Sequence, residues 1–256
     1  MRASDIDRIK ALPLFADAAA ETFRVATAGA HVQRFPPGTM LLLEGDPVDF
    51  LYVLLDGQVE LHGTWNDHET VLTILRPVST FILAAVVLDA AALMSARTLE
   101  RCEILMIPGD AIRTAMRLDP RFAMSVSRDL AGCYRGLVRN IKNIKLRNST
   151  ERLANYLLAQ RAIDSSGSTV ILHHEKRILA SLLGMTPENL SRSFATLQKH
   201  GVSVQGSVVT LANTAALEQL AKPDPLIDNN APRGGDIVAE ADAEIWLSEL
   251  SRTKPR

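Results

Sequence analysis

The sequence contains few cysteines, and the two that it has, Cys102 and Cys133, lie far apart. Separated thiols make neither a disulfide framework nor a CxxC metal site, and they cannot supply the four ligands of an iron–sulfur cluster. Long apolar runs are also missing, because the longest nearly uncharged stretch, 81–94, is too short to span a bilayer and contains Asp89. No signal-peptide core is visible near Met1, so we expect a soluble cytoplasmic protein with no membrane partner.

An excess of positive charge is also missing, because the net charge is only −1 at pH 7, so the chain has no global attraction for nucleic acid. Residues 145–200 nevertheless contain eight Lys and Arg residues against four Asp and Glu residues, a local excess whose sign suits phosphate contact. Enzyme signatures are absent, since there is no GxSxG, P-loop, HExxH or GxGxxG pattern. We therefore expect a protein that is not an enzyme.

The first part of the chain, residues 1–118, predicts a small β domain. Residues 3–25 form an amphipathic pattern that predicts a helix before it. Short apolar strands then alternate with turn signals, of which Asp56-Gly57 and Asn66-Asp67 favour hairpins. Regular short strands of this kind indicate an antiparallel barrel or sandwich. A short helix over 109–118 is expected to close this domain.

A long helix is predicted over residues 119–147, beginning at Asp119-Pro120. Its apolar positions recur every three or four residues and form a heptad-like seam with one slip. The seam predicts a dimer interface made of Val126, Leu130, Cys133, Leu137, Ile141 and Ile144. The alternative is a helix that packs against its own barrel.

Residues 148–221 predict a winged helix-turn-helix. The segment KRILASLL ends at Gly184, and a second helix begins at Thr186, a good N-cap, with Pro187 in its first turn. Its apolar stripe consists of Leu190, Phe194 and Leu197. Two short strands, 202–204 and 208–211, read as the wing. The overall class is thus α+β, and residues 222–256 are predicted to be a flexible tail without an assigned function.

A second face of the predicted helix carries Glu188, Ser191 and Arg192, spaced i, i+3 and i+4. Arg can donate two bonds to guanine, Glu can accept one from cytosine, and Ser can serve either groove edge, so these residues are expected to read bases. The flanking residues expected to contact DNA are Thr186, Lys176, Arg177 and Lys199. A solvated surface charge is the alternative for each of these.

Particular residues of this arrangement resemble one known family. The segment GDPVDFLYVLLDGQVEL contains Gly45, Tyr52 and Gly57, a turn at Pro37-Gly38 precedes it, and LPLF occupies 12–15. With the order barrel, long helix, helix-turn-helix and wing, these residues resemble the Crp/Fnr family of bacterial transcription regulators over about residues 5–220. The resemblance implies a homodimer that binds double-stranded DNA and works with RNA polymerase.

The resemblance also implies a DNA site. Family members that read TTGAT-like half-sites carry Glu-x-x-Ser-Arg, which matches Glu188, Ser191 and Arg192. Members with the reading pattern of the cyclic-AMP receptor carry a basic residue immediately before the Glu, where this sequence has Pro187. The recognition helix is therefore similar to the Fnr side of the family, and a two-fold dimer would read a palindrome.

The effector implied by the resemblance is not a cyclic nucleotide. The family's nucleotide cassette needs Gly-Glu and Arg-Ser, and the matching positions here are Leu83-Ala84 and Met94-Ser95. Both charged anchors are missing, and a buried phosphate without a partner is strongly unfavourable. An apolar effector pocket is expected instead, with the residues Leu61, Leu83, Ala84, Met94, Ser95 and Leu137.

Several occupants of this pocket stay open at the sequence level. The segment IKLRNSTERLANYLL resembles Dnr-like NO regulators, which favours haem with His62 or His31 as an axial ligand and Cys102 as a third candidate. The other options are an apolar small molecule, or a cassette that binds nothing. A thiol-responsive regulator acting through Cys133, and a haem or small-molecule module without DNA output, are the alternative functions.

Overall fold

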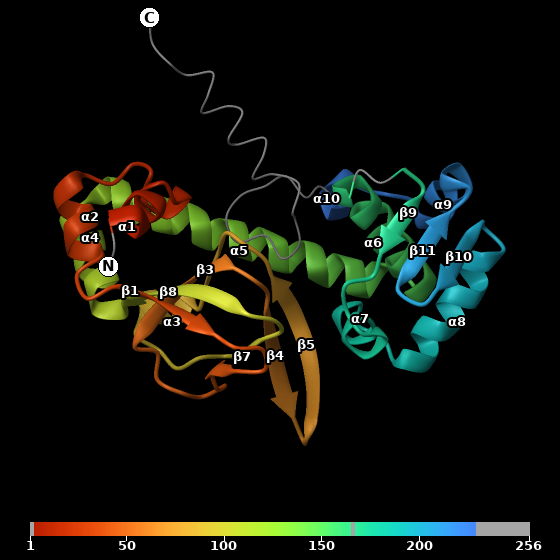
Figure 1. Ribbon diagram of the computed structural model, residues 1–256, viewed down its shortest axis with the longest axis horizontal. Helices are drawn as coiled ribbons and strands as arrows, with labels where there is room; N and C mark the ends of the chain where they lie inside the picture. The colour runs from red at the N-terminus through yellow and green to blue at the C-terminus, as the bar shows by residue number, and fades with distance from the viewer. Residues whose placement is uncertain (1–2, 165–166, 229–256) are drawn as a thin grey trace, which may run out of the picture. The chain divides into compact units, whose positions relative to one another are not determined.

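The computed structural model describes residues 3–164 and 167–228, which divide into two compact units (Figure 1). The first unit ends at Gly136 and the second begins at Leu137, so the division falls inside one long helix. Most of the predicted tail, residues 229–256, lies outside the described residues. Within the described part of the chain, no helix is long and apolar enough to cross a membrane.

Two antiparallel four-stranded sheets form the first unit, as the pattern of short strands predicted. One sheet has the order β1 (His31–Phe35), β8 (Cys102–Pro108), β3 (Phe50–Asp56) and β6 (Ser79–Phe81). The other has the order β2 (Met40–Leu42), β7 (Ser95–Thr98), β4 (Val59–Trp65) and β5 (His68–Leu75). Both sheets contribute to one apolar core, for example through Leu54 and Ile104 from the first and Leu61 from the second. The domain is a barrel-like sandwich, because its two sheets are not closed into one ring.

Two hairpins lie at the predicted turns. Gly57, between β3 and β4, has a φ of +89°, and a Cβ there would lie 2.5 Å from the carbonyl oxygen of Arg101. Only glycine fits this position, since both the left-handed backbone and the close approach exclude a side chain. Asn66 and Asp67, between β4 and β5, also have positive φ, as a two-residue hairpin of type I′ requires.

The helices of the first unit build a second apolar core. They are α1 (Ala3–Lys10), the 3₁₀ helix η1 (Pro13–Phe15), α2 (Ala20–Ala26), α3 (Leu83–Leu88), α4 (Gly109–Leu118) and the first part of α5. Phe15 stacks on Phe122 of α5 in this core, with ring centroids 5.5 Å apart. The single helix predicted over 3–25 is wrong, because the chain breaks near Pro13, which cannot donate a backbone hydrogen bond.

The long helix α5 (Pro120–Leu146) begins at the predicted place. The Asp119 carboxylate accepts bonds from the backbone N–H groups of Ala19 and Arg121 and from the Thr22 hydroxyl. These bonds, with that from Ala19 first, hold the pKa of Asp119 below its usual value. Val126 is fully buried in the core of its own unit, so it has no surface for a second chain, and its place in the predicted dimer seam is wrong.

The second unit is a winged helix-turn-helix. It consists of α6 (Ser149–Asp164), β9 (Thr169–Ile171), α7 (Lys176–Leu182), α8 (Pro187–Gln198), β10 (Val202–Gln205), β11 (Val208–Leu211), α9 (Thr214–Ala221) and α10 (Pro225–Asp228). The predicted wing is the antiparallel pair β10–β11, and β9 joins it as a third strand that was not predicted. The core of this unit includes Leu153, Leu157 and Leu179 together with the apolar stripe of α8.

Candidate functional site

The turn between α7 and α8 forms as the sequence predicted. Gly184 follows α7 with a φ of +62°, a conformation that suits glycine after a helix C-terminus. The hydroxyl of Thr186 accepts a bond from the backbone N–H of Asn189 at 3.3 Å and caps α8, with Pro187 in the first turn. Local sequence chemistry therefore fixes where α8 begins.

The helix α8 separates its apolar and polar residues cleanly. Leu190 and Leu197 are 1% and 0% exposed, and Phe194 is also buried. Glu188, Ser191 and Arg192 are exposed on a different face, as their spacing predicted. This exposed set is called the reading face below.

The reading face offers both hydrogen-bond acceptors and a hydrogen-bond donor. The pKa of Glu188 lies below its usual value, first because of a hydrogen bond with Thr186 and also because Arg192 is nearby. Glu188 is thus an ionised acceptor at neutral pH, beside a guanidinium that only donates. The Ser191 hydroxyl donates to the carbonyl oxygen of Pro187 at 3.0 Å, which leaves its lone pairs for a further donor.

The residues expected to flank the reading face are also exposed. Lys176 and Arg177 begin α7, and Lys199 follows the last residue of α8. Thr186 is exposed as well, although its hydroxyl already serves as the helix cap. The surface of this helix pair is therefore basic at its ends and mixed in charge on its reading face.

A buried arginine that the sequence reasoning missed supports the helix-turn-helix from behind. Arg152 of α6 is 7% exposed, and its Nε donates to the carbonyl oxygen of Leu183 at 2.8 Å. Its Nη2 donates to Gly184, and its Nη1 to Arg147 and Ile144. Arg152 thereby links the carbonyl groups at the end of α5 to those at the end of α7. Burial lowers the pKa of the Arg152 guanidinium.

The predicted pocket residues of the first unit do not gather around one space. Leu61 and Met94 contact the core between the two sheets, whereas Leu83 packs into the helical core of the first unit. Ala84 is exposed, so the position matched to the family's Glu points to solvent. The first turn of α3 directs Leu83 to the other core, so the structure does not bring it together with Leu61 and Met94, and its role in an effector pocket stays a prediction.

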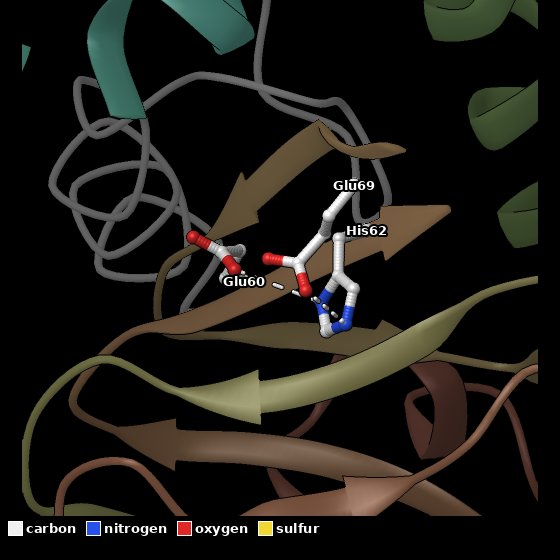
Figure 2. Close-up of side chains that lie close together, drawn as sticks. All are labelled: Glu60, His62 and Glu69. Atoms are coloured by element: carbon white, nitrogen blue, oxygen red, sulfur yellow. Dashed lines mark ion pairs between the residues drawn. The ribbon is translucent and has the colours of Figure 1, made fainter. Parts of the chain in front are cut away.

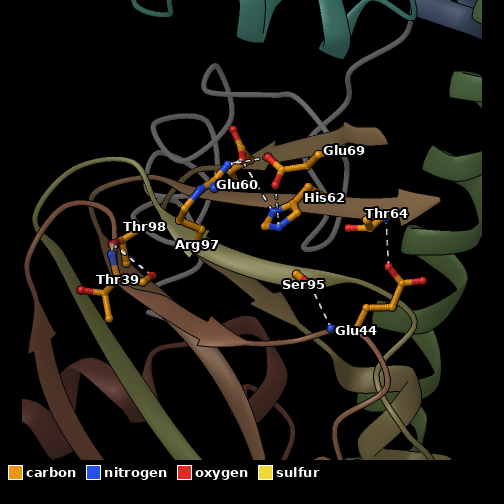
Figure 3. A network of polar contacts seen from close by, with 9 residues as sticks. All are labelled: Thr39, Glu44, Glu60, His62, Thr64, Glu69, Ser95, Arg97 and Thr98. Carbon is orange, nitrogen blue, oxygen red and sulfur yellow. Dashed lines mark hydrogen bonds and ion pairs between the residues drawn. The ribbon is translucent and has the colours of Figure 1, made fainter. Parts of the chain in front are cut away.

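The two remaining predicted pocket residues, Ser95 and Leu137, lie in different surroundings. Ser95 is 4% exposed, and its hydroxyl accepts a bond from the backbone N–H of Glu44 at 2.9 Å (Figure 3). Its polar group is therefore already engaged within the sandwich. Leu137 is 49% exposed on α5 and belongs to the second unit.

The three candidate haem ligands have unsuitable surroundings. Leu61 of β4 faces the core, so its neighbour His62 projects from the opposite face of the sheet, where it lies beside Glu60 and Glu69 (Figure 2). His31 is exposed and forms a T-shaped ring pair with Phe50. The Cys102 thiol donates to backbone carbonyl groups, and burial raises its pKa, which disfavours the thiolate needed for iron or for redox sensing.

Comparison with known proteins matches both units to described families. Residues 32–119 match the cyclic nucleotide-binding domain, and residues 151–220 match the Crp-like helix-turn-helix domain. A sandwich domain followed by a winged helix-turn-helix defines a class of non-enzymatic DNA-binding regulators.

Relatives place the chain within this class. It is 25% identical over 194 residues to the CRP-like cAMP-activated global transcriptional regulator of Mycobacterium tuberculosis, covering 73% of this chain and 87% of that protein. It is 26% identical over 197 residues to the fumarate and nitrate reduction regulatory protein of Escherichia coli, covering 72% and 76%. A solved Crp/Fnr-family structure from Eubacterium rectale has the same fold, with a TM-score of 0.68 at 17% identity over 83% of this chain and 99% of that one. The chain belongs to the Crp/Fnr family of DNA-binding transcription regulators.

Proposed function

We propose that the protein is a homodimeric regulator whose α8 reads a palindrome of TTGAT-like half-sites and whose sandwich domain responds to an apolar effector. The observation that carries the proposal is the exposed reading face of Glu188, Ser191 and Arg192 on a helix whose opposite side is buried. A helix held in this way presents its side chains to a major groove without unfolding any part of its own core.

Base recognition follows from the donors and acceptors of the reading face. The guanidinium of Arg192 matches the two acceptors of guanine, O6 and N7. The ionised carboxylate of Glu188 accepts from the amino group of cytosine, and a TTGAT half-site supplies both a guanine and, on the other strand, its cytosine. The basic residues Lys176, Arg177 and Lys199 are placed at the helix ends, where phosphates flank the groove.

The second half of α5 supports a dimer. Leu137, Ile141 and Ile144 are 49%, 50% and 39% exposed, although they continue the apolar seam of the helix. Exposed apolar residues at heptad spacing are satisfied by a second copy of the same helix. A two-fold dimer would present two reading faces to half-sites about one DNA turn apart, and RNA polymerase is the expected downstream partner.

The absence of charged anchors argues against a cyclic nucleotide. Ala84 and Met94 stand where the family's nucleotide-binding members carry Glu and Arg. The nearest cation along β7, Arg97, is engaged with Glu60 and Glu69 (Figure 3). A phosphate buried here would therefore lack a counter-charge.

An apolar effector fits the surface around α3 better. Leu88 and Leu93 are 74% and 81% exposed, at the end of α3 and in the segment after it. Haem is less suited to this region, because His62 projects from the outer face of its sheet and His31 is exposed. We therefore favour an apolar small molecule over a haem-bound gas such as NO.

DNA reading is tested by fluorescence anisotropy with a labelled duplex that contains TTGAT-N4-ATCAA. We expect at least about ten-fold tighter binding than to a scrambled duplex of equal length at about 0.15 M salt. Equal affinity for the two duplexes, in the presence and absence of haem, would remove the proposed half-site. A matched pair of variants, Arg192→Ala and the exposed Gln198→Ala on the same helix, separates base reading from a general loss of helix surface.

Dimerisation and effector choice are tested separately. Light scattering of the parent should give a dimer, and Ile141→Glu should give a monomer that retains its circular dichroism spectrum. Calorimetric titration with cyclic AMP should give no heat of binding. Saturable binding of cyclic AMP to the parent would contradict the inference that a phosphate lacks a counter-charge here.

A further inference from the structure

The outer face of the β2–β7–β4–β5 sheet contains a polar cluster with no role in DNA reading. Glu60 and His62 lie on β4, and Glu69 lies on the neighbouring strand β5 (Figure 2). Glu60 and His62 are only 1% and 2% exposed, although both are polar. Val59 and Leu61 face the apolar core, so the alternation of the strand places Glu60 and His62 together on its other face.

The imidazole of His62 has acceptors on both sides but no hydrogen bond to either. Its Nδ1 is 3.6 Å from Oε1 of Glu60, and its Nε2 is 3.6 Å from Oε2 of Glu69. Hydrogen bonds between nitrogen and oxygen are formed at about 2.7–3.2 Å, so both separations are too long. Among the described residues, the buried Nδ1 has no hydrogen-bond partner, which is costly unless a ligand satisfies it.

Arg97 of β7 holds the two carboxylates from the other side (Figure 3). Its Nη2 donates to Oε1 of Glu60 and to Oε1 of Glu69, the latter at 2.7 Å. The two oxygens of Glu69 thus have different neighbours. Oε1 accepts from Arg97, and Oε2 faces His62. Two carboxylates and one imidazole are groups that a divalent cation takes as ligands.

We propose that Glu60, His62 and Glu69 bind one divalent first-row transition-metal ion and thereby join β4 to β5. The ligand atoms of these three residues lie within 4.8 Å of one another. Ligand atoms of a tetrahedral ion with bonds of about 2.1 Å stand about 3.4 Å apart, close to the 3.6 Å between Nδ1 and Glu60. Imidazole with carboxylates suits zinc, cobalt or manganese rather than magnesium.

The most exposed ligand completes the site. Glu69 is 41% exposed at its side chain, and one of its carboxylate oxygens already lies within 4.8 Å of the ligand atoms of Glu60 and His62. Arg97 acts as an outer partner that orients both carboxylates, as hydrogen-bonded groups do around other metal ligands. Water fills the remaining coordination position.

Calorimetric titration of the untagged, chelator-treated full chain with Zn²⁺ and with Co²⁺ tests this proposal. We expect one ion per chain, visible d–d absorption for Co²⁺, and no binding of Mg²⁺ at similar concentrations. His62→Gln should weaken Zn²⁺ binding at least about ten-fold. His68→Gln is the matched control, because His68 is an exposed histidine on the same hairpin and outside the cluster.

Glu69→Gln keeps the proposal testable if His62→Gln does not fold. This isosteric change at a half-exposed side chain should preserve the circular dichroism spectrum and still weaken Zn²⁺ binding. Failure of the parent to bind Zn²⁺, or equal affinities for the parent, His62→Gln and Glu69→Gln, would overturn the proposal. The latter result would assign the bound ion to other surface histidines.

Discussion

Polar and charged side chains are exposed on the reading face of α8 but buried on the outer face of β4. On α8, Glu188 and Arg192 are exposed. On β4, Glu60 and His62 are 1% and 2% exposed, and Arg97 of β7 donates a hydrogen bond to Glu60. Exposed charges keep their hydration until a partner replaces it, whereas buried charges need partners within the fold.

Apolar residues show the reverse difference. The helix α8 buries Leu190 and Leu197, but α3 and the segment after it expose Leu88 and Leu93. One region thus offers charge to a highly charged partner, DNA, and the other offers apolar surface. The proposed partners of the two units, DNA and an apolar effector, would thus be chemically different.

The largest effect is expected at Arg152, the buried cation behind the exposed reading face. Arg152→Met should lower the free energy of unfolding of the second unit by about 2–4 kcal/mol, because several carbonyl groups lose their donor. Chemical denaturation followed by circular dichroism measures this loss. Hydrogen exchange should report it at the turn between α7 and α8.

Arg161→Met is the matched control on the same helix. Arg161 makes a solvent-exposed bond to the carbonyl oxygen of Gly167, so its loss should cost less than about 1 kcal/mol. If the two variants were equally stable, the bonds of Arg152 would not support the helix-turn-helix.

A smaller effect is expected for DNA binding by Arg192→Ala. Loss of a bidentate base contact should weaken binding to the TTGAT palindrome by about 1–3 kcal/mol and relax specificity at one base pair. Competition anisotropy with a set of single-base variants of the site measures both quantities. Unchanged affinity and unchanged specificity would remove Arg192 from the reading role.

Lys199→Ala distinguishes phosphate contact from base reading. It should weaken binding to all sequences alike and reduce the slope of log affinity against log salt by about one. A changed base preference would show that Lys199 reaches a base edge instead.

Asp129 offers a pH test of buried charge in the first unit. The Thr80 hydroxyl donates to it at 2.6 Å, but burial raises the pKa of Asp129 to about 6. A carboxyl whose pKa is raised by folding stabilises the fold below its unfolded pKa and loses that contribution as the pH rises through its folded pKa.

Asp129→Asn should therefore remove this dependence. Relative to the variant, the parent should lose about 1–3 kcal/mol of unfolding free energy between about pH 4 and about pH 7. Parallel denaturation curves across this range provide the measurement. A constant difference between the two proteins would mean that Asp129 is not desolvated.

The smallest effect on stability is expected at the exposed apolar surface near α3. Leu93 is 81% exposed, so Leu93→Ser should change the free energy of unfolding by less than about 0.5 kcal/mol. The buried Leu61→Ala, in contrast, should cost about 2–4 kcal/mol. Thermal unfolding of both variants tests whether Leu93 contributes to folding, and a large loss for Leu93→Ser would show that this surface is packed.

Elements with strong local signals were predicted well from the sequence. The start of α8 at Thr186-Pro187, the hairpin at Asp56-Gly57 and the wing around Gly206 depend on caps and backbone conformations that a few residues specify. The separation of the reading face from Leu190 and Phe194 follows from helical periodicity alone.

Predictions that depended on which core a side chain enters were less successful. The same periodicity placed Val126 in a dimer seam, but the first turns of α5 pack against their own unit. Leu83 likewise enters the helical core instead of the sandwich core. An apolar pattern shows that a residue is buried, but it does not show against which neighbour.

The sequence by itself determined the order of the units, the winged helix-turn-helix and the chemistry of its reading face, because these features arise from contacts near in the chain. Only the tertiary structure revealed Arg152 behind the turn and the cluster of Glu60, His62 and Glu69, whose members become neighbours through strand pairing and helix packing. Buried polar groups take their role from distant partners, and those partners are set by the fold.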